Sequence, residues 1–320
     1  MQKPPALFEK AQNLTLKHFG KTIQLYAPLY ISNECINSCT YCGFNTKSGI
    51  KRVTLTVEQI IQEGKFLKKQ GFQHILIVCG ENKQKVPVSF LKEAIKKLKE
   101  DFVSISIEVY PMEEEEYREL IEAGADGLAI YQETYHPETY KKVHPKGPKS
   151  NYQWRYEAPE RAARAGMRKL GLGVLLGLYD WRYEIEKLSE QLNYLMKKYW
   201  QTQFQLSFPR LNPAETDYEI KYPVSDEDLI AIITTLRINF PQLPFTLSTR
   251  ENEKFRNQIL PYGITSMSAG SKTFPGGYTL GLDSGKQFEI ADNRTVKEVV
   301  TSIKKAGYEP VFKDWDRELI

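Results

Sequence analysis

Short runs of β-branched and aromatic residues alternate along this chain with stretches in which apolar residues recur every three or four positions. The first pattern is typical of buried strands, and the second of helices that cover a core with one face. Thr56 and Ser225 are each followed by acidic residues and predict two helix starts. Two further helices are predicted over Glu184–Tyr199 and Thr295–Ala306. The predicted strands are Tyr26–Ser32, Gln73–Cys79, Val103–Tyr110, Gly127–Tyr131, Lys169–Leu176, Phe204–Phe208, Pro244–Ser248 and Ile264–Ser268.

Eight strand–helix repeats in 320 residues predict an α/β fold, a single parallel (β/α)8 barrel of the TIM type. A doubly wound open sheet is the alternative, but no glycine-rich dinucleotide fingerprint follows the first strand. An amphipathic helix is predicted over Leu7–Phe19, where it would cap the bottom of the barrel. We therefore expect an N-terminal helical segment over residues 1–25, and the barrel with a C-terminal extension over residues 26–320.

Polar residues follow most of the predicted strands. Active residues of such barrels lie just after the C-terminal ends of the strands, so one face of the barrel would collect them. Strand ends are generally polar, which accounts for part of the pattern. The residues are Gly80, Glu81, Glu108, Tyr110, Gln132, Glu133, Ser207, Arg210, Ser248, Arg250 and Ser268–Gly270.

Three of the four cysteines, Cys35, Cys39 and Cys42, follow the first predicted strand with C-x3-C-x2-C spacing. A [4Fe–4S] cluster normally takes four cysteines, so three would leave one iron open to a ligand. A disulfide is the alternative, but nothing in the sequence suggests secretion. A structural zinc site would need a fourth ligand, and the four histidines show no matching spacing.

The overall composition narrows the class of protein. The net charge is +4 and the lysines are spread over predicted helix faces, so we expect no nucleic-acid partner. The first five residues lack the apolar core of a signal peptide, and no run of about 18 apolar residues predicts a membrane span. Clustered thiols without an export signal indicate a cytoplasmic protein.

The cysteine motif, with Tyr41 just before its last cysteine, resembles that of the radical S-adenosylmethionine (SAM) superfamily. The resemblance implies that the three cysteines hold a [4Fe–4S] cluster and that SAM chelates the open iron. Gly80 and Glu81 resemble the Gly-Gly-Glu element that contacts the SAM amino group, with Cys79 in place of the first glycine. Tyr41, Gly80 and Glu81 are therefore expected to bind the cofactor, and Cys79 is expected to be a buried strand cysteine.

Longer segments are similar to the 2-iminoacetate synthase family, the tyrosine lyases of thiamine-thiazole synthesis. The resemblance implies cleavage of the Cα–Cβ bond of L-tyrosine to 2-iminoacetate and p-cresol, while SAM yields 5′-deoxyadenosine and methionine. It also implies an electron donor of flavodoxin or ferredoxin type, and thiazole synthase as a further partner. The family pattern has a longer segment before the first helix, which bears on docking of that synthase. The matching segments include Pro28–Asn33, Tyr131–His136, Ser207–Leu211, Leu247–Glu251, Met267–Ser271, Pro275–Tyr278 and Lys313–Asp316.

Three other interpretations stay open. HydG, the tyrosine lyase of hydrogenase maturation, resembles the same barrel but adds cysteines for a second cluster, and this sequence has no cysteine after Cys79. A lyase of the same shape could act on another aromatic amino acid in another pathway. An electron carrier or cluster scaffold would want protein ligands on all four irons.

The reaction implied by the resemblance needs groups for two carboxylates and a ribose. A guanidinium binds a carboxylate bidentately, so Arg250 aided by Ser248, or Arg210, is expected to bind the tyrosine carboxylate. The alternative for both arginines is a strand-end ion pair with Glu251 or Asp217.

SAM needs a second set of groups. Glu133 is expected to accept hydrogen bonds from the ribose hydroxyls, and Arg161 or Arg164 to face the SAM carboxylate, unless both are solvated helix arginines. A substrate loop is expected over Thr273–Tyr278, with a plain turn as the alternative. His136 and His144 could exchange protons, although ordinary loop histidines are the commoner case.

Overall fold

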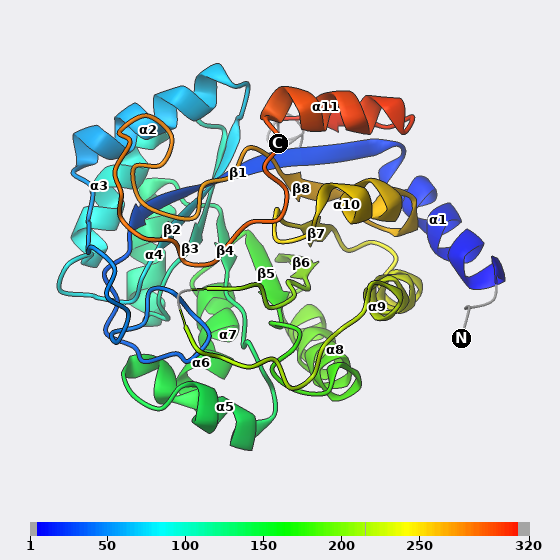
Figure 1. Cartoon of the computed structure of the whole chain (residues 1–320), viewed down its shortest axis with the longest axis horizontal. Coiled ribbons are helices and arrows are strands. Elements are labelled where there is room, and N and C mark those ends of the chain that lie inside the picture. The colour runs from blue at the N-terminus through cyan, green and yellow to red at the C-terminus, as the bar shows by residue number, and fades with distance from the viewer. Residues whose placement is uncertain (1–4, 215, 313–320) are drawn as a thin grey trace.

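Eight parallel strands close into a barrel in the computed structural model, which describes residues 5–214 and 216–312 (Figure 1). Neighbouring strands pair in chain order, and β1 pairs with both β8 and β2, which closes the barrel. The predicted α/β barrel is confirmed. The strands are β1 Thr22–Ser32, β2 His74–Cys79, β3 Ser104–Glu108, β4 Gly127–Ala129, β5 Lys169–Gly173, β6 Gln203–Ser207, β7 Phe245–Leu247 and β8 Ser266–Ser268.

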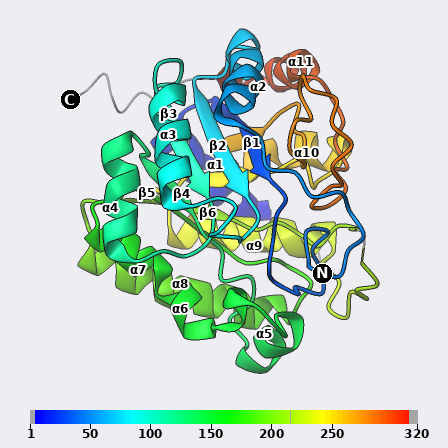
Figure 2. The same cartoon turned by 90° about the vertical axis from the view of Figure 1, so that its left-hand side faces the viewer.

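Helices cover the outside of the strands, as the turned view in Figure 2 shows. The strands are buried on both faces, which is why they read as nearly continuous apolar runs such as that of β2. One large core joins the strands to the inner faces of the helices. The helices are α1 Pro5–Phe19, α2 Val57–Lys69, α3 Val88–Leu98, α4 Glu114–Ala123, α5 Pro137–Val143, α6 Tyr152–Tyr156, α7 Ala158–Arg164, α8 Trp181–Lys198, α9 Asp226–Asn239, α10 Glu253–Ile259 and α11 Val296–Lys305.

The predicted helix starts have the expected capping geometry. Thr56 and Gln59 form a reciprocal capping box before α2, and Ser225 forms the same box with Asp228 before α9. Each box satisfies two backbone groups that the first helical turn leaves unpaired. Because the caps fix where the helices begin, they also fix the lengths of the loops that enter them.

The chain adds a ninth strand, β9 (Glu309–Val311), that the sequence did not predict. It pairs in parallel with Thr22–Gln24, the first residues of β1. β1 therefore begins four residues before the predicted strand, and the boundary expected at residue 25 falls inside it. The predicted N-terminal helix is present as α1 and packs on α9 and the short turn Leu260–Tyr262.

No helix in the described part of the chain is both long and apolar enough to cross a bilayer.

Candidate active site

A cavity that is partly open to solvent lies at the C-terminal ends of the strands. This is the face on which barrel enzymes place their active sites. The structure brings nine of the twelve predicted site residues to its wall and leaves Arg161, Arg164 and Arg210 outside it. The nine are Cys35, Cys39, Tyr41, Cys42, Gly80, Glu81, Glu133, Ser248 and Arg250.

Hydrogen bonds from Arg52 stabilise the conformation of the cysteine-bearing loop after β1. Its Nη1 donates to the carbonyl oxygens of Asn33 and Phe44, both at 2.8 Å, and its Nη2 donates to Ser48 Oγ at 3.1 Å. The Asn33 side chain in turn accepts from the Val53 amide at 2.7 Å. A preformed loop of this kind loses little conformational entropy when it binds a ligand.

The three thiols suit a cluster better than a single ion. Burial, together with the neighbouring thiol of Cys35, raises the pKa of Cys42 to about 11, and burial also raises the pKa of Cys39. A metal centre would reverse this, because its positive charge stabilises the thiolates. No three Cys, His, Asp or Glu side chains of the described residues gather closely enough for one ion. A cluster takes each cysteine on a different iron, so the donor set fits it.

Gly80 is needed because β2 ends against the cysteine loop. A Cβ at this position would lie 2.4 Å from the carbonyl oxygen of Glu34 and 3.1 Å from Cβ of Cys35. Glu81 accepts a hydrogen bond from Nδ2 of Asn37 at 2.6 Å, and the same amide lies 3.7 Å from Sγ of Cys35. Gly80 and Glu81 thus shape the wall beside the first cysteine.

Tyr41 and Cys79 occupy the same wall. The Tyr41 hydroxyl lies 2.8 Å from Nε2 of His144, whose Nδ1 faces the Tyr140 carbonyl at 3.0 Å. His144 is therefore a buried anchor for Tyr41 that does not line the cavity. Cys79 ends β2 as expected, but it is only partly buried and lines the cavity.

Glu133 has the strongest cationic surroundings in the cavity. Lys149 Nζ lies 2.6 Å and Arg155 Nη2 3.4 Å from its Oε1. Burial alone would raise the pKa of Glu133, but these two cations hold it below its usual value. Among the described residues, Glu133 is the one non-glycine residue with positive φ, 72°. Such backbone strain persists where surrounding contacts fix it, commonly at ligand sites.

Arg250 and Glu108 both line the cavity. The Arg250 guanidinium stacks 3.3 Å from the centroid of the Phe288 ring and forms no hydrogen bond or ion pair with the residues that the structure describes. Glu108 likewise has no hydrogen-bond partner for its carboxyl group in the described chain. Burial, with the nearby charge of Glu133, raises its pKa to about 7, while Arg250 lowers it. Both groups are free to bind a ligand.

The other three predicted arginines have structural partners. Arg210 lies 2.8 Å from Asp226 and 3.0 Å from Oε1 of Glu251, so the strand-end ion pair is the arrangement observed. Arg161 Nε donates to the Met112 carbonyl at 2.8 Å, and its guanidinium lies 3.5 Å from the Trp154 ring centroid.

Arg164 is half-exposed and pairs with Glu114 at 2.8 Å. Neither helix arginine reaches the cavity. Arg155, one helix earlier, does, and sequence reasoning missed it together with Lys149. Helical periodicity could not show which way Arg155 and Lys149 point, because the short helix α6 and the loop before it lack a clear apolar stripe.

The loop expected to contact substrate lies over the cavity only in part. Thr273 lines the cavity, whereas Tyr278 donates from its hydroxyl to the Pro28 carbonyl at 2.7 Å. Buried Glu63 of α2 accepts from the Tyr278 and Thr279 amides at 2.9 and 2.6 Å. His136 stacks on Tyr179 with ring centroids 3.8 Å apart and lies outside the cavity wall.

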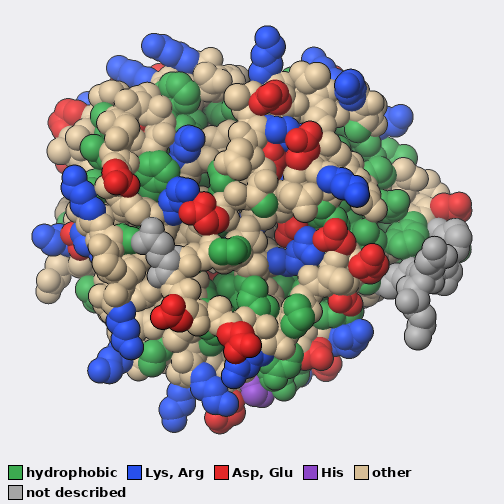
Figure 3. All heavy atoms as spheres, in the orientation of Figure 1, with side chains coloured by type: hydrophobic (Ala, Val, Ile, Leu, Met, Phe, Trp, Pro, Cys, Tyr) green, Lys and Arg blue, Asp and Glu red, His purple; other side chains and the backbone are tan. Residues whose placement is uncertain are grey.

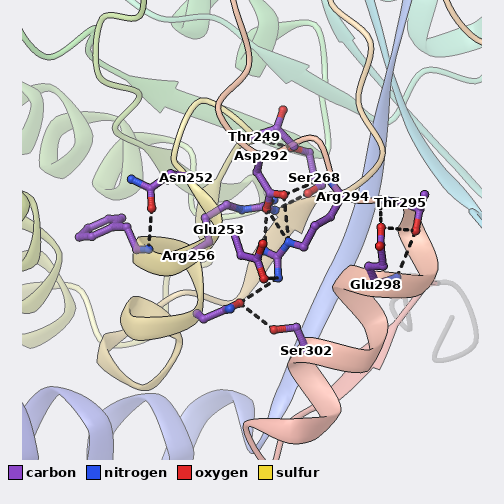
Figure 4. A network of polar contacts seen from close by, with 12 residues as sticks. Thr249, Asn252, Glu253, Arg256, Ser268, Asp292, Arg294, Thr295, Glu298 and Ser302 are labelled. Carbon is purple, nitrogen blue, oxygen red and sulfur yellow. Dashed lines mark hydrogen bonds and ion pairs between the residues drawn. The ribbon is translucent and has the colours of Figure 1, made fainter.

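A polar network fixes Thr249, which lies between Ser248 and Arg250 just after β7 (Figure 4). Buried Arg256 of α10 pairs with Asp292 and donates to the Ser268 carbonyl of β8. Ser268 Oγ accepts from the Thr249 amide at 3.1 Å, and the Thr249 carbonyl accepts from the Ala291 amide at 2.9 Å. The network therefore positions the two strand ends that face the substrate space.

Comparison with known proteins places this geometry in a family. The radical SAM superfamily matches residues 29–191, and the Biotin and Thiamin Synthesis associated domain matches residues 207–309. The chain belongs to the radical SAM superfamily, whose members use a [4Fe–4S] cluster and SAM. Over 314 residues it is 42% identical to 2-iminoacetate synthase of Escherichia coli (strain K12), covering 98% of this chain and 83% of the relative. Within the superfamily it is a member of the 2-iminoacetate synthase family.

Solved structures of other proteins resemble this chain over almost its whole length. The structure of HydG, a maturase of the [FeFe]-hydrogenase, superposes with a TM-score of 0.93 at 33% identity, covering 98% of this chain and 70% of that one. Methylornithine synthase (PylB) superposes with a TM-score of 0.76 at 23% identity, covering 98% of this chain and 90% of that one. At this identity, the likeness to methylornithine synthase shows the fold alone.

Proposed function

We propose that this chain is a radical SAM tyrosine lyase that cleaves the Cα–Cβ bond of L-tyrosine to 2-iminoacetate and p-cresol, for the thiazole of thiamine. The observation that carries the proposal is the unpartnered pair of Arg250 and Glu108 in the cavity that also contains the three cysteines. A free cation and a free carboxyl group in one cavity match the carboxylate and ammonium of an amino acid. Membership in the 2-iminoacetate synthase family supports the reaction.

Cys35, Cys39 and Cys42 would hold the cluster, each through one thiolate. When bound, a cluster reduced by one electron would cleave SAM to methionine and supply a 5′-deoxyadenosyl radical, which would become 5′-deoxyadenosine on taking a hydrogen atom from the substrate amino group. The protein's part is to orient the two ligands and exclude water.

The SAM side of the cavity is assigned to the charged cluster around Glu133. Its carboxylate is ionised and can accept two ribose hydroxyls. Lys149 and Arg155 replace Arg161 and Arg164 as the groups that face the SAM carboxylate, because both line the cavity. Gly80, Glu81 and Tyr41 complete the wall on the cysteine side.

The substrate side is assigned to Arg250, Ser248 and Glu108. The Arg250 fork binds the tyrosine carboxylate, and its stacking on Phe288 leaves the edges of the guanidinium available for hydrogen bonds. Glu108, with a pKa of about 7, can take a proton from the substrate ammonium at neutral pH. The neutral amine is then the group from which a hydrogen atom is removed.

The reaction also defines partners. A cluster of this type needs a one-electron donor, which we expect to be of flavodoxin or ferredoxin type. 2-Iminoacetate hydrolyses in water, so direct transfer to thiazole synthase is expected. A cluster on reduced thiols and a low-potential donor both favour a cytoplasmic location for the reaction.

Anaerobic reconstitution with SAM, dithionite and tyrosine tests the proposal. We expect 5′-deoxyadenosine, p-cresol, and glyoxylate from hydrolysis of the imine. Formation of 5′-deoxyadenosine without p-cresol would contradict the choice of tyrosine. Iron analysis should give about four irons per chain, the content of one [4Fe–4S] centre. About eight irons, with cyanide and CO among the products, would support the chemistry of hydrogenase maturation instead.

A further inference from the structure

The loop that bears the three cysteines reaches solvent at one apolar side chain. Ile36, directly after Cys35, is 46% exposed, whereas Cys39 of the same loop is buried. Ile36 is one of only six large hydrophobic residues that are exposed in the described chain. The residue next to the first cysteine therefore exposes an apolar side chain to solvent.

Three segments meet around Ile36 through backbone hydrogen bonds. The Ile36 amide donates to the Glu81 carbonyl at 2.9 Å, which brings the loop after β2 alongside. The Ser38 amide donates to the Lys146 carbonyl at 3.1 Å, which brings the segment after α5 alongside. The Thr46 amide donates to the Asn37 carbonyl at 2.9 Å and folds the cysteine loop back on itself.

These segments are rich in lysine. Residues 33–50, 80–86 and 137–150 contain seven lysines and three glutamates, Glu34, Glu81 and Glu138. Lys149 lies in the cavity wall, and Lys83 pairs with Glu116. Figure 3 shows Lys and Arg side chains at the lower left of the molecule, where Figure 1 draws the loop after β1. The remaining lysines are exposed and have no ion-pair partner among the described residues: Lys47, Lys85, Lys141, Lys142 and Lys146.

We infer that Ile36 and these five lysines, hereafter the Ile36 patch, form the docking surface for an acidic one-electron carrier protein. The inference rests on the proposed function, because it requires a cluster on the three cysteines. The carrier would lose one electron and the cluster would gain it, and no bond or proton changes at this surface.

The chemistry of the patch suits such a partner. Transient electron-transfer complexes have small interfaces and form weakly. Charge complementarity raises their association rate, while a small apolar contact fixes the approach. Exposed lysines on the segments that meet beside Ile36 favour a negatively charged protein whose redox centre lies at its own surface.

Charge reversal tests the patch. The variants are Lys47→Glu with Lys146→Glu, and independently Lys85→Glu with Lys142→Glu. The control, Lys297→Glu with Lys304→Glu, makes the same change in net charge on α11, which lies at the opposite edge of the molecule (Figure 1). Binding of an acidic flavodoxin to the reconstituted enzyme is measured by surface plasmon resonance over a range of ionic strength.

We expect both patch variants to bind flavodoxin about tenfold more weakly at low salt, with the difference shrinking as salt is raised, and the control to bind normally. 5′-Deoxyadenosine formation should fall with reduced flavodoxin as donor and stay unchanged with dithionite. Equal binding by patch and control variants would overturn the inference, as would an equal loss with both reductants. The readout does not depend on the amino-acid substrate. Absence of 5′-deoxyadenosine with either donor in the parent protein would instead refute the proposed function.

Discussion

The pKa values of two largely enclosed glutamates in the cavity are shifted in opposite directions. Burial raises the pKa of Glu108 to about 7, whereas Lys149 and Arg155 overcome the effect of burial on Glu133 and lower its pKa. The difference lies in the neighbours, because Glu133 contacts two cations directly and Glu108 contacts none. A pair of carboxyl groups with separated pKa values is a common sign of divided roles in an active site.

Arg250 is the first test at this scale. Loss of a charge-assisted pair in a dry site costs about 2–5 kcal/mol, so Arg250→Ala should weaken tyrosine binding tens- to thousands-fold. Arg250→Lys should also bind poorly, because an ammonium cannot form the bidentate fork. Arg210→Ala is the control: it should lower thermal stability and leave the tyrosine dissociation constant unchanged, since Arg210 pairs with Glu251 outside the cavity. Unchanged tyrosine binding by Arg250→Ala would show that another residue binds the tyrosine carboxylate.

Glu108 should give the activity an acidic limb near its pKa of about 7. The carboxylate form accepts the proton, so kcat/KM should rise as pH rises through this value, and Glu108→Gln should be slow without that limb. The native state keeps the proton more tightly than the unfolded state, so unfolding free energy should fall between about pH 4.5 and 7, by roughly 3 kcal/mol in total.

Glu184 provides a matched comparison for that experiment. Burial raises its pKa to about 7 as well, but it lies outside the cavity and accepts from the Tyr135 amide at 2.6 Å. Glu184→Gln should change the pH dependence of stability in the same window and leave the limb in kcat/KM intact. An unchanged limb in Glu108→Gln would exclude Glu108 as the proton acceptor.

The cysteines are expected to differ sharply in their effects. Cys39→Ala should abolish SAM cleavage and lower the iron content of a folded barrel, because no other thiol can take its place on the cluster. Cys79→Ser should retain about four irons per chain even though Cys79 lines the cavity. Iron analysis and circular dichroism on both proteins check this, and a cluster lost from Cys79→Ser would make it a ligand.

At the scale of elements, hydrophobic patterning predicted all eight barrel strands to within a few residues, because strands buried on both faces leave continuous apolar runs. It also predicted the strand-end residues Glu133 and Arg250, whose position along the chain determines which way they face. Arg155 and Lys149 could not be predicted, since their direction depends on how α6 packs. The strand β9 could not be predicted, because three residues that include Pro310 form no recognisable strand pattern.

The network in Figure 4 leads to a prediction at this scale. Asp292→Asn removes the charge that compensates buried Arg256 and should lower the free energy of unfolding by about 3–5 kcal/mol. Because the network positions β7 and β8, tyrosine binding should weaken as well. Glu298→Gln, which alters only the exposed capping box of α11, should have a smaller effect on thermal stability and none on tyrosine binding. A normal melting temperature for Asp292→Asn would contradict the structural role.

At the scale of the molecule, the proposals give ligands and electrons different routes to the cavity. Substrate and SAM would enter at the open C-terminal face of the barrel, whereas electrons would enter through the Ile36 patch beside the first cysteine. Separate routes would let the carrier bind without entering the space that SAM and substrate occupy. The ligands themselves could then keep water out of that space while the electron is delivered.

The pairing of β9 with β1 also protects the barrel from self-association through an exposed strand edge. On the edge of β1 that faces β2, pairing with β2 begins only at Ala27, so without β9 the residues Thr22–Gln24 would present an open strand edge that could recruit another chain. The Glu309 amide donates to the Lys21 carbonyl at 2.7 Å, so alternation along the strand turns the Pro310 nitrogen towards the outer edge. Proline has no N–H to offer there, which ends the sheet. A chain shortened after Gly307 should therefore aggregate on concentration, as light scattering would detect.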